Sequence, residues 1–161
     1  MAARTLGDCA RKLGERLLPE IIPVLERGLQ SASSAERQDV CIGLREIMVN
    51  ATSKEHVAAF AYVLLPAVRH ALLDTDEGVR AAASNTWDML HSCVGPRALD
   101  DVIGYLLARL ADSDEASTDA AYALDALRQL VAVKSKVVMP YLIPKVREHS
   151  RRRVTCSLHI T

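Results

Sequence analysis

The feature that most constrains this chain is a short apolar motif that recurs about every 40 residues. The motif begins at positions 23, 66, 104 and 144, where the sequence reads PVLERGL, PAVRHAL, GYLLARL and PKV. Around these positions apolar residues recur at i, i+3, i+4 and i+7, the spacing that places them on one face of an α-helix. Because no stretch alternates with a period of two, the chain is predicted to be all-α.

Two helices fit within each period, which is typical of an α-solenoid of the HEAT or armadillo type, built from antiparallel helix pairs. We place a partial repeat at 1–15, full repeats at about 16–51, 52–95 and 96–133, and a partial repeat at 134–146. Neither partial repeat has the polar outer face of a terminal repeat. We therefore expect the 1–146 array to be part of a longer one.

Turn residues predict where several helices begin and end. Ser33 with Glu36, and Thr52 with Glu55, have the spacing of a capping box, in which each side chain satisfies a free backbone donor at a helix start. Gly95, followed by a proline, predicts a helix that ends on a residue with positive φ. Trp87 lies in the apolar stripe of its helix, so we expect it in the core rather than in a partner-binding pocket.

Charged residues near the turns follow a HEAT pattern, in which an Asp is followed five and six residues later by Val and Arg. The second repeat has all three residues, whereas the first keeps only the Arg and the third only the Asp. We expect Arg37, Asp74, Arg80 and Asp112 to form a ladder of ion pairs between repeats. Exposed pairs contribute about 0–1 kcal/mol each, so such a ladder would set repeat geometry more than stability. The alternative is that these residues are solvated turn residues.

The formal net charge is zero, with 20 basic and 20 acidic residues, but it is unevenly distributed. From position 134 onward the net charge is +6, and before it −6. The basic residues of this end are Lys134, Lys136, Lys145, Arg147, Arg151, Arg152 and Arg153. Such a patch could contact RNA through its phosphates. The other interpretations are a solvated tail or a nuclear-import signal. Residues 147–161 have no apolar stripe, and we expect a basic, disordered tail there.

Motifs for catalysis, metals and nucleotides are absent from the sequence. HExxH, GxSxG and GxGxxG do not occur, and the five histidines are scattered. Carboxylate pairs such as Asp100–Asp101 and Asp114–Glu115 lie at turns or helix starts, where helix capping explains them. We therefore expect a protein that is not an enzyme and that has no cofactor or metal.

Two further features concern the compartment. No stretch reaches the roughly 20 apolar residues of a membrane-spanning helix, so we expect no membrane contact. Cys9, Cys41, Cys93 and Cys156 lie far apart without a CxxC pair. Because structural thiols of this kind are typical of reducing compartments, we expect a cytoplasmic chain.

Four stretches resemble the family of general-control translational activators. They are residues 4–15 (RTLGDCARKLGE), 18–23 (LPEIIP), 36–44 (ERQDVCIGL) and 137–144 (VVMPYLIP). The resemblance covers about residues 4–146 and is strongest in the N-terminal third and near Pro140. It indicates a segment from the C-terminal half of the family's chain. Because it ends near Val146, the arginines of the tail inherit no role from it.

The resemblance implies a role as well as a fold. Members of this family are very long cytosolic HEAT-repeat scaffolds that associate with ribosomes and promote activation of the general-control kinase during amino-acid starvation. It therefore implies a non-catalytic scaffold with the ribosome and the kinase as partners, but no binding site. We expect partners to bind the turns at 74–77 and 112–115 or the exposed faces of second helices. The alternatives are a HEAT-type adaptor for transport or phosphatase assembly, and RNA binding through the basic tail.

Overall fold

The computed structural model describes residues 18–51, 53–112 and 118–157, which form seven α-helices and no strand. The helices are α2 (Leu18–Gly28), α3 (Ser34–Asn50), α4 (Lys54–Ala59), α5 (Ala61–Leu72), α6 (Glu77–Val94), α7 (Pro96–Asp112) and α8 (Thr118–Ser157). The prediction of an all-α chain is confirmed over these residues.

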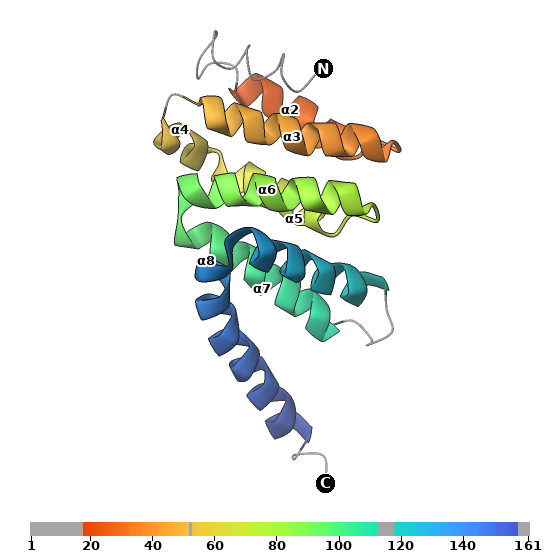
Figure 1. Cartoon of the computed structure of the whole chain (residues 1–161), viewed down its shortest axis with the longest axis vertical. Coiled ribbons are helices and arrows are strands. Elements are labelled where there is room, and N and C mark those ends of the chain that lie inside the picture. The colour runs from red at the N-terminus through yellow and green to blue at the C-terminus, as the bar shows by residue number, and fades with distance from the viewer. Residues whose placement is uncertain (1–17, 52, 113–117, 158–161) are drawn as a thin grey trace.

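The helices form successive layers along the long axis of the molecule (Figure 1). Helices α2 and α3 lie at the N-terminal end, α5 and α6 in the middle, and α7 with the beginning of α8 below them. The most extensive contact between helices joins α3 to α6, and α6 also packs against α8. Each helix pair therefore covers a face of the next, which is the arrangement expected of stacked repeats.

The helix ends follow from the turn residues. The Ser33 side chain accepts a hydrogen bond from the Glu36 backbone N–H, as the capping-box spacing predicts. The cap of α4 is Ser53, which accepts from the His56 backbone N–H, so the prediction that Thr52 occupies this position is wrong by one residue. Gly95 ends α6 with a φ of 74°, a conformation that favours glycine.

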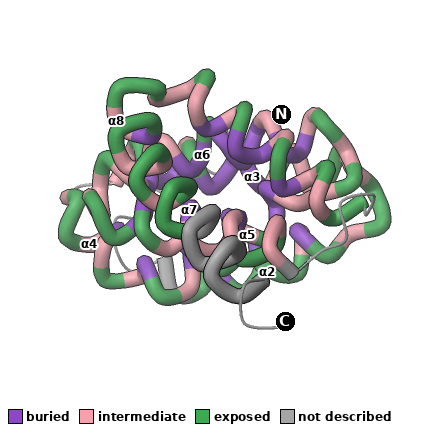
Figure 2. The backbone as a smooth tube through the Cα atoms, turned by 90° about the horizontal axis from the view of Figure 1, so that it is seen from below, coloured by how far each residue is buried: buried purple, intermediate pink, exposed green. Residues whose placement is uncertain are grey.

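The core lies inside the stack: Figure 2, which looks along the long axis, shows buried residues toward the middle of the view and exposed residues around its outside. Aliphatic side chains dominate it, and its largest fully buried side chain is Trp87. The Trp87 indole N–H donates to the Ala98 carbonyl over 3.2 Å and so connects α6 to the start of α7. The prediction that Trp87 packs in the core is confirmed.

Helix α8 consists of two arms that meet at Lys134, whose φ of −145° and ψ of 54° are not helical. The first arm (118–133) packs beside α6, and the second arm (135–157) turns away along the end of the stack (Figure 1). The second arm stays helical to Ser157, which corrects the expectation of a disordered tail for residues 147–157. Arginine and glutamate favour helix locally, so an existing helix extends through this region without an apolar stripe.

No helix among the described residues is both long enough and apolar enough to cross a membrane.

Candidate functional site

The first charged contact between helix pairs joins Arg37 of α3 to Asp74 in the turn before α6. The Arg37 Nε donates to Asp74 Oδ2 over 2.7 Å, and Nη2 donates to Oδ1 over 2.8 Å. The remaining Nη1 donates to the Ser31 carbonyl over 2.8 Å. Both side chains are mostly covered, with exposed fractions of 13% and 10%. A two-point contact of this kind fixes direction as well as distance between two helix pairs.

The same contact sets the ionisation of Asp74. Burial alone would raise the pKa of the Asp74 carboxyl, but hydrogen bonds from Arg37 and from the Asp76 backbone N–H outweigh this effect and lower the pKa below its usual value. In turn, the hydrogen bond to Asp74 raises the pKa of Arg37. The pair is therefore fully charged at neutral pH, and the Asp74 carboxylate also holds the turn that starts α6.

The second charged contact joins Arg80 of α6 to the first arm of α8. The Arg80 Nε donates to Asp125 Oδ2 over 2.6 Å, and Nη1 donates to the carbonyls of Asp74 and Thr75 over 2.8 and 3.1 Å. Its guanidinium lies over the Tyr122 ring, 5.1 Å from the centroid. Arg80 thus connects its own turn to the following helix pair.

Sequence reasoning selected three residues of these two contacts and missed Asp125. The HEAT pattern places the acidic partner in the next turn, at Asp112, whose side chain lies outside the described residues. Asp125 lies instead within the first arm of α8, three residues after Tyr122. Their spacing places Tyr122 and Asp125 on one helical face, but the sequence does not show that this face lies toward Arg80.

The predicted basic patch is divided by the fold. Lys134 Nζ lies 2.6 Å from Asp88 Oδ1 and donates to Ser92 Oγ over 3.2 Å, and Lys145 Nζ lies 3.4 Å from Asp100 Oδ1. Two of its lysines are therefore neutralised by the acidic residues of α6 and α7. Lys136 and Arg147 are exposed on the second arm. The side chains of Arg151, Arg152 and Arg153 lie outside the described part of the chain.

A polar hollow of about 540 Å³ lies next to the ladder, where three helix pairs meet. Asp74 and Thr75 of the 74–77 turn line it together with His70, Tyr105 and Tyr122. The Arg69 guanidinium lies 4.7 Å from the centroid of the Tyr105 ring. The hollow offers aromatic surface and hydrogen-bonding groups beside a turn that was predicted to contact partners. The other such turn, 112–115, lies outside the described residues but for the backbone of its first residue.

Within the described ranges, no three His, Cys, Asp or Glu side chains are grouped so that they could hold a metal ion. The carboxylates of Asp74 and Asp125 are paired with Arg37 and Arg80. The arrangement of these charged groups holds helix pairs together and presents the turns between them.

Comparison with known families matches residues 2–149 to the EF3 N-terminal HEAT repeat. This match confirms the HEAT prediction made from the 40-residue period. No solved structure matches the chain significantly.

Comparison with curated proteins gives alignments over about nine tenths of this chain. The chain is 55% identical over 146 residues to the stalled ribosome sensor GCN1 of Mus musculus, and 40% identical over 146 residues to the eIF-2-alpha kinase activator GCN1 of Dictyostelium discoideum. The corresponding activator of Saccharomyces cerevisiae is 38% identical over 145 residues. These alignments cover 91%, 91% and 89% of this chain, which spans about 5% of the length of each relative.

Proposed function

Because the chain belongs to the EF3 N-terminal HEAT repeat family, we propose that it acts as a non-catalytic repeat scaffold in translational control. The observation that carries this proposal is the 55% identity, over 91% of the chain, to a protein named as a stalled ribosome sensor. Relatives in two distant organisms are named as activators of the eIF-2-alpha kinase. We infer that this chain supports activation of that kinase on ribosomes, in the cytoplasm, during amino-acid starvation.

The mechanism follows from the stacked fold. A surface that contacts both the ribosome and the kinase raises their effective concentration toward each other without any chemical step. The ladder residues Arg37, Asp74 and Arg80 would hold the relative orientation of the helix pairs, and the 74–77 turn with the adjoining hollow would contact protein. We also place the segment in the C-terminal half of the longer relatives, on the strength of residues 4–23 and 137–144.

Two features support protein contact over RNA contact. Lys134 and Lys145 are neutralised by Asp88 and Asp100, which leaves less positive charge for phosphates than the sequence indicates. The hollow beside the ladder, in contrast, offers tyrosine rings and polar groups of both signs. Partners that present mixed side chains suit such a surface better than a phosphate backbone.

A segment exchange tests the proposal. In cells of Mus musculus, the matching 146 residues of the stalled ribosome sensor are replaced by those of this chain, and phosphorylation of the alpha subunit of initiation factor two is measured after amino-acid withdrawal. We expect phosphorylation close to that of unmodified cells. As a control, a HEAT segment of equal length from an unrelated protein should lower it. If the two replacements lower phosphorylation equally at equal protein levels, the proposal is wrong.

A further inference from the structure

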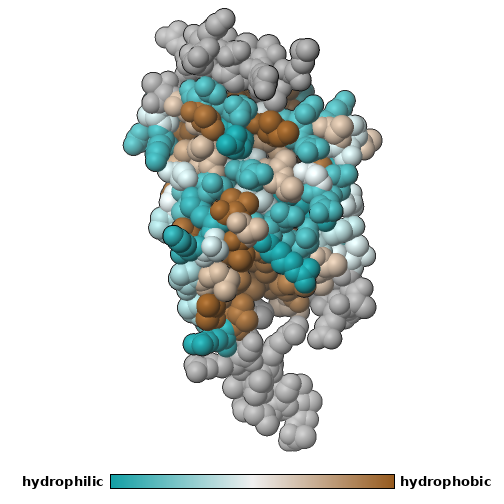
Figure 3. Space-filling model, viewed as in Figure 1, coloured by the Kyte–Doolittle hydropathy of each residue, from teal (hydrophilic) through white to brown (hydrophobic). Residues whose placement is uncertain are grey.

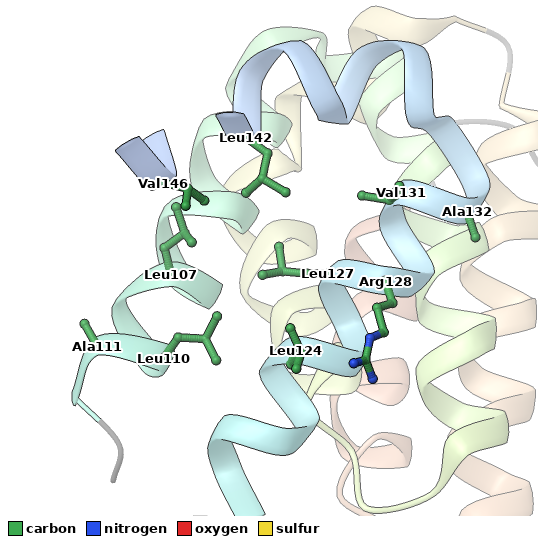
Figure 4. Close-up of a pocket in the computed structure, with 10 residues that line it drawn as sticks. All are labelled: Leu107, Leu110, Ala111, Leu124, Leu127, Arg128, Val131, Ala132, Leu142 and Val146. Atoms are coloured by element: carbon green, nitrogen blue, oxygen red, sulfur yellow. The ribbon is translucent and has the colours of Figure 1, made fainter. Parts of the chain in front are cut away.

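The first turns of the second arm of α8 make its apolar contact with the stack. Leu142 and Val146 line an apolar groove together with Leu107 of α7 (Figure 4), in the lower part of the stack where Figure 3 shows apolar side chains gathered. The positions that would continue this stripe carry polar side chains: His149, Ser150 and Arg153. Residues 147–157 are therefore helical without an apolar stripe. A helix held by local propensity opens more readily than one held by burial.

Two arginines precede a hydroxyl group in this part of the arm. The sequence at 151–155 reads RRRVT, which places Arg152 three positions and Arg153 two positions before Thr155. Among all serines and threonines of the sequence, Thr155 alone has arginine at both positions. Basophilic Ser/Thr kinases bind substrate segments in extended form, and their carboxylates pair with arginines at these two positions. Thr155 thus combines the charge pattern of such a substrate with a segment that can open.

We propose that Thr155 is phosphorylated by a Ser/Thr kinase that selects arginine three and two positions before the hydroxyl group. The Thr155 hydroxyl oxygen forms a bond to the γ-phosphorus of ATP, while the bond between this phosphorus and the β–γ bridging oxygen breaks. The hydroxyl proton passes to the catalytic base of the kinase, and ADP leaves. The site is independent of the proposed scaffold contacts, which use the 74–77 turn and the adjoining hollow.

A phosphate on Thr155 changes the end of α8. Thr155 lies in the last turn of this helix, which ends at Ser157. The free carbonyls of a last turn carry partial negative charge, so a phosphate with a charge of about −2 opposes the helix there. The phosphate also lowers the net charge of residues 147–161 from +3 to about +1. The phosphorylated chain is therefore less helical and less basic at this end.

The test treats the full chain with ATP and the catalytic subunit of cyclic-AMP-dependent protein kinase, a probe of the basophilic class, and locates the phosphate by mass spectrometry. We expect Thr155 to be the main site and Thr155→Ala to remove most of the incorporation. Arg152→Ala and Arg153→Ala should each slow phosphorylation of Thr155 at least about tenfold, because each leaves a carboxylate of the kinase unpaired. Phosphorylation elsewhere but not at Thr155 overturns the proposal.

Arg151→Ala is the matched control, since it removes the same charge from the same run but from outside the pair. It should slow phosphorylation of Thr155 by less than about fivefold, the range of an exposed charge. If it slows the reaction as much as Arg152→Ala does, general attraction to a basic segment explains the result and the proposal is wrong.

Ser150 is an internal control in every sample. Arg147 stands three positions before it, but Glu148 stands two positions before it, so it should be phosphorylated at least about tenfold more slowly than Thr155. Equal rates at the two hydroxyls overturn the assignment to Thr155. Circular dichroism should show lower helicity for the phosphorylated chain than for Thr155→Ala treated in the same way. Equal helicity overturns the effect on α8.

Discussion

Replacing Gly28 by alanine tests the close packing of the first helix pair. A β-carbon at this position would lie 2.6 Å from Val40 Cγ2 on α3, far inside ordinary van der Waals contact. The valine is stiff about χ1 and yields little. Overpacking of this kind costs about 1–3 kcal/mol, whereas alanine in place of a helical glycine gains about 0.5–1 kcal/mol. We expect Gly28→Ala to lower the free energy of unfolding by about 1–2 kcal/mol.

The assay is urea unfolding followed by circular dichroism, with Gly104→Ala as matched control. A β-carbon on Gly104 of α7 would meet no atom within 4 Å, so this change should stabilise the chain by about 0.5–1 kcal/mol. Removing the obstacle with Val40→Ala should make Gly28→Ala neutral or stabilising, a coupling of about 1–3 kcal/mol. If Gly28→Ala stabilises like the control, or if its effect is the same with and without Val40, the described approach of α2 to α3 is wrong.

Three further predictions concern titrating groups. Burial raises the pKa of the Cys41 thiol to about 12, so iodoacetamide at pH 8 should alkylate Cys41 only as fast as the chain unfolds. Rapid modification without unfolding would contradict the buried position of Cys41. Burial and the nearby Lys134 charge lower the pKa of His91 against the opposing effect of Asp88. Below about pH 6.5 the unfolded chain therefore binds more protons than the folded chain, and the melting temperature should fall from pH 7.5 to 5.5. The fall should be smaller in His91→Gln. Because the pKa of Asp74 is lowered in the fold, its contribution to stability is present above about pH 4 and disappears as pH falls further. In Asp74→Asn the melting temperature should therefore fall less steeply below about pH 4. The same fall in the variant as in the unmodified chain would exclude Asp74 as its source.

Periodicity predicts most of the core, although Val24 and Leu124, which share the helical spacing, are 56% and 42% exposed. Burial repeats along the chain with the helical period, so the same spacing that places Trp87 in a stripe also buries it. Arg37 and Asp74 could be selected for the same reason, since equivalent residues of stacked repeats meet at equivalent places. The helix at 147–157 could not be predicted from periodicity, because the sequence there has no apolar stripe.

The sequence could not predict which side chains of a long helix meet those of the neighbouring helix pair. Asp125 binds Arg80 from the middle of a helix and not from a turn, and nothing in the spacing along the chain shows which helical turn of the next pair faces Arg80. The ion pairs of Lys134 and Lys145 depend likewise on how α8 bends against α6 and α7. These contacts turn an apparent basic patch into a surface of mixed charge.

The most direct test of the scaffold account is a binding titration of the chain with purified ribosomes, read by co-sedimentation. We predict saturable binding that persists at moderate salt and changes little in the double variant Lys136→Glu, Arg147→Glu, because the account assigns the contact to the stacked helices. Absence of binding would contradict it. So would binding that the double variant abolishes and that falls steeply with salt, since this is the behaviour of RNA bound through the basic arm.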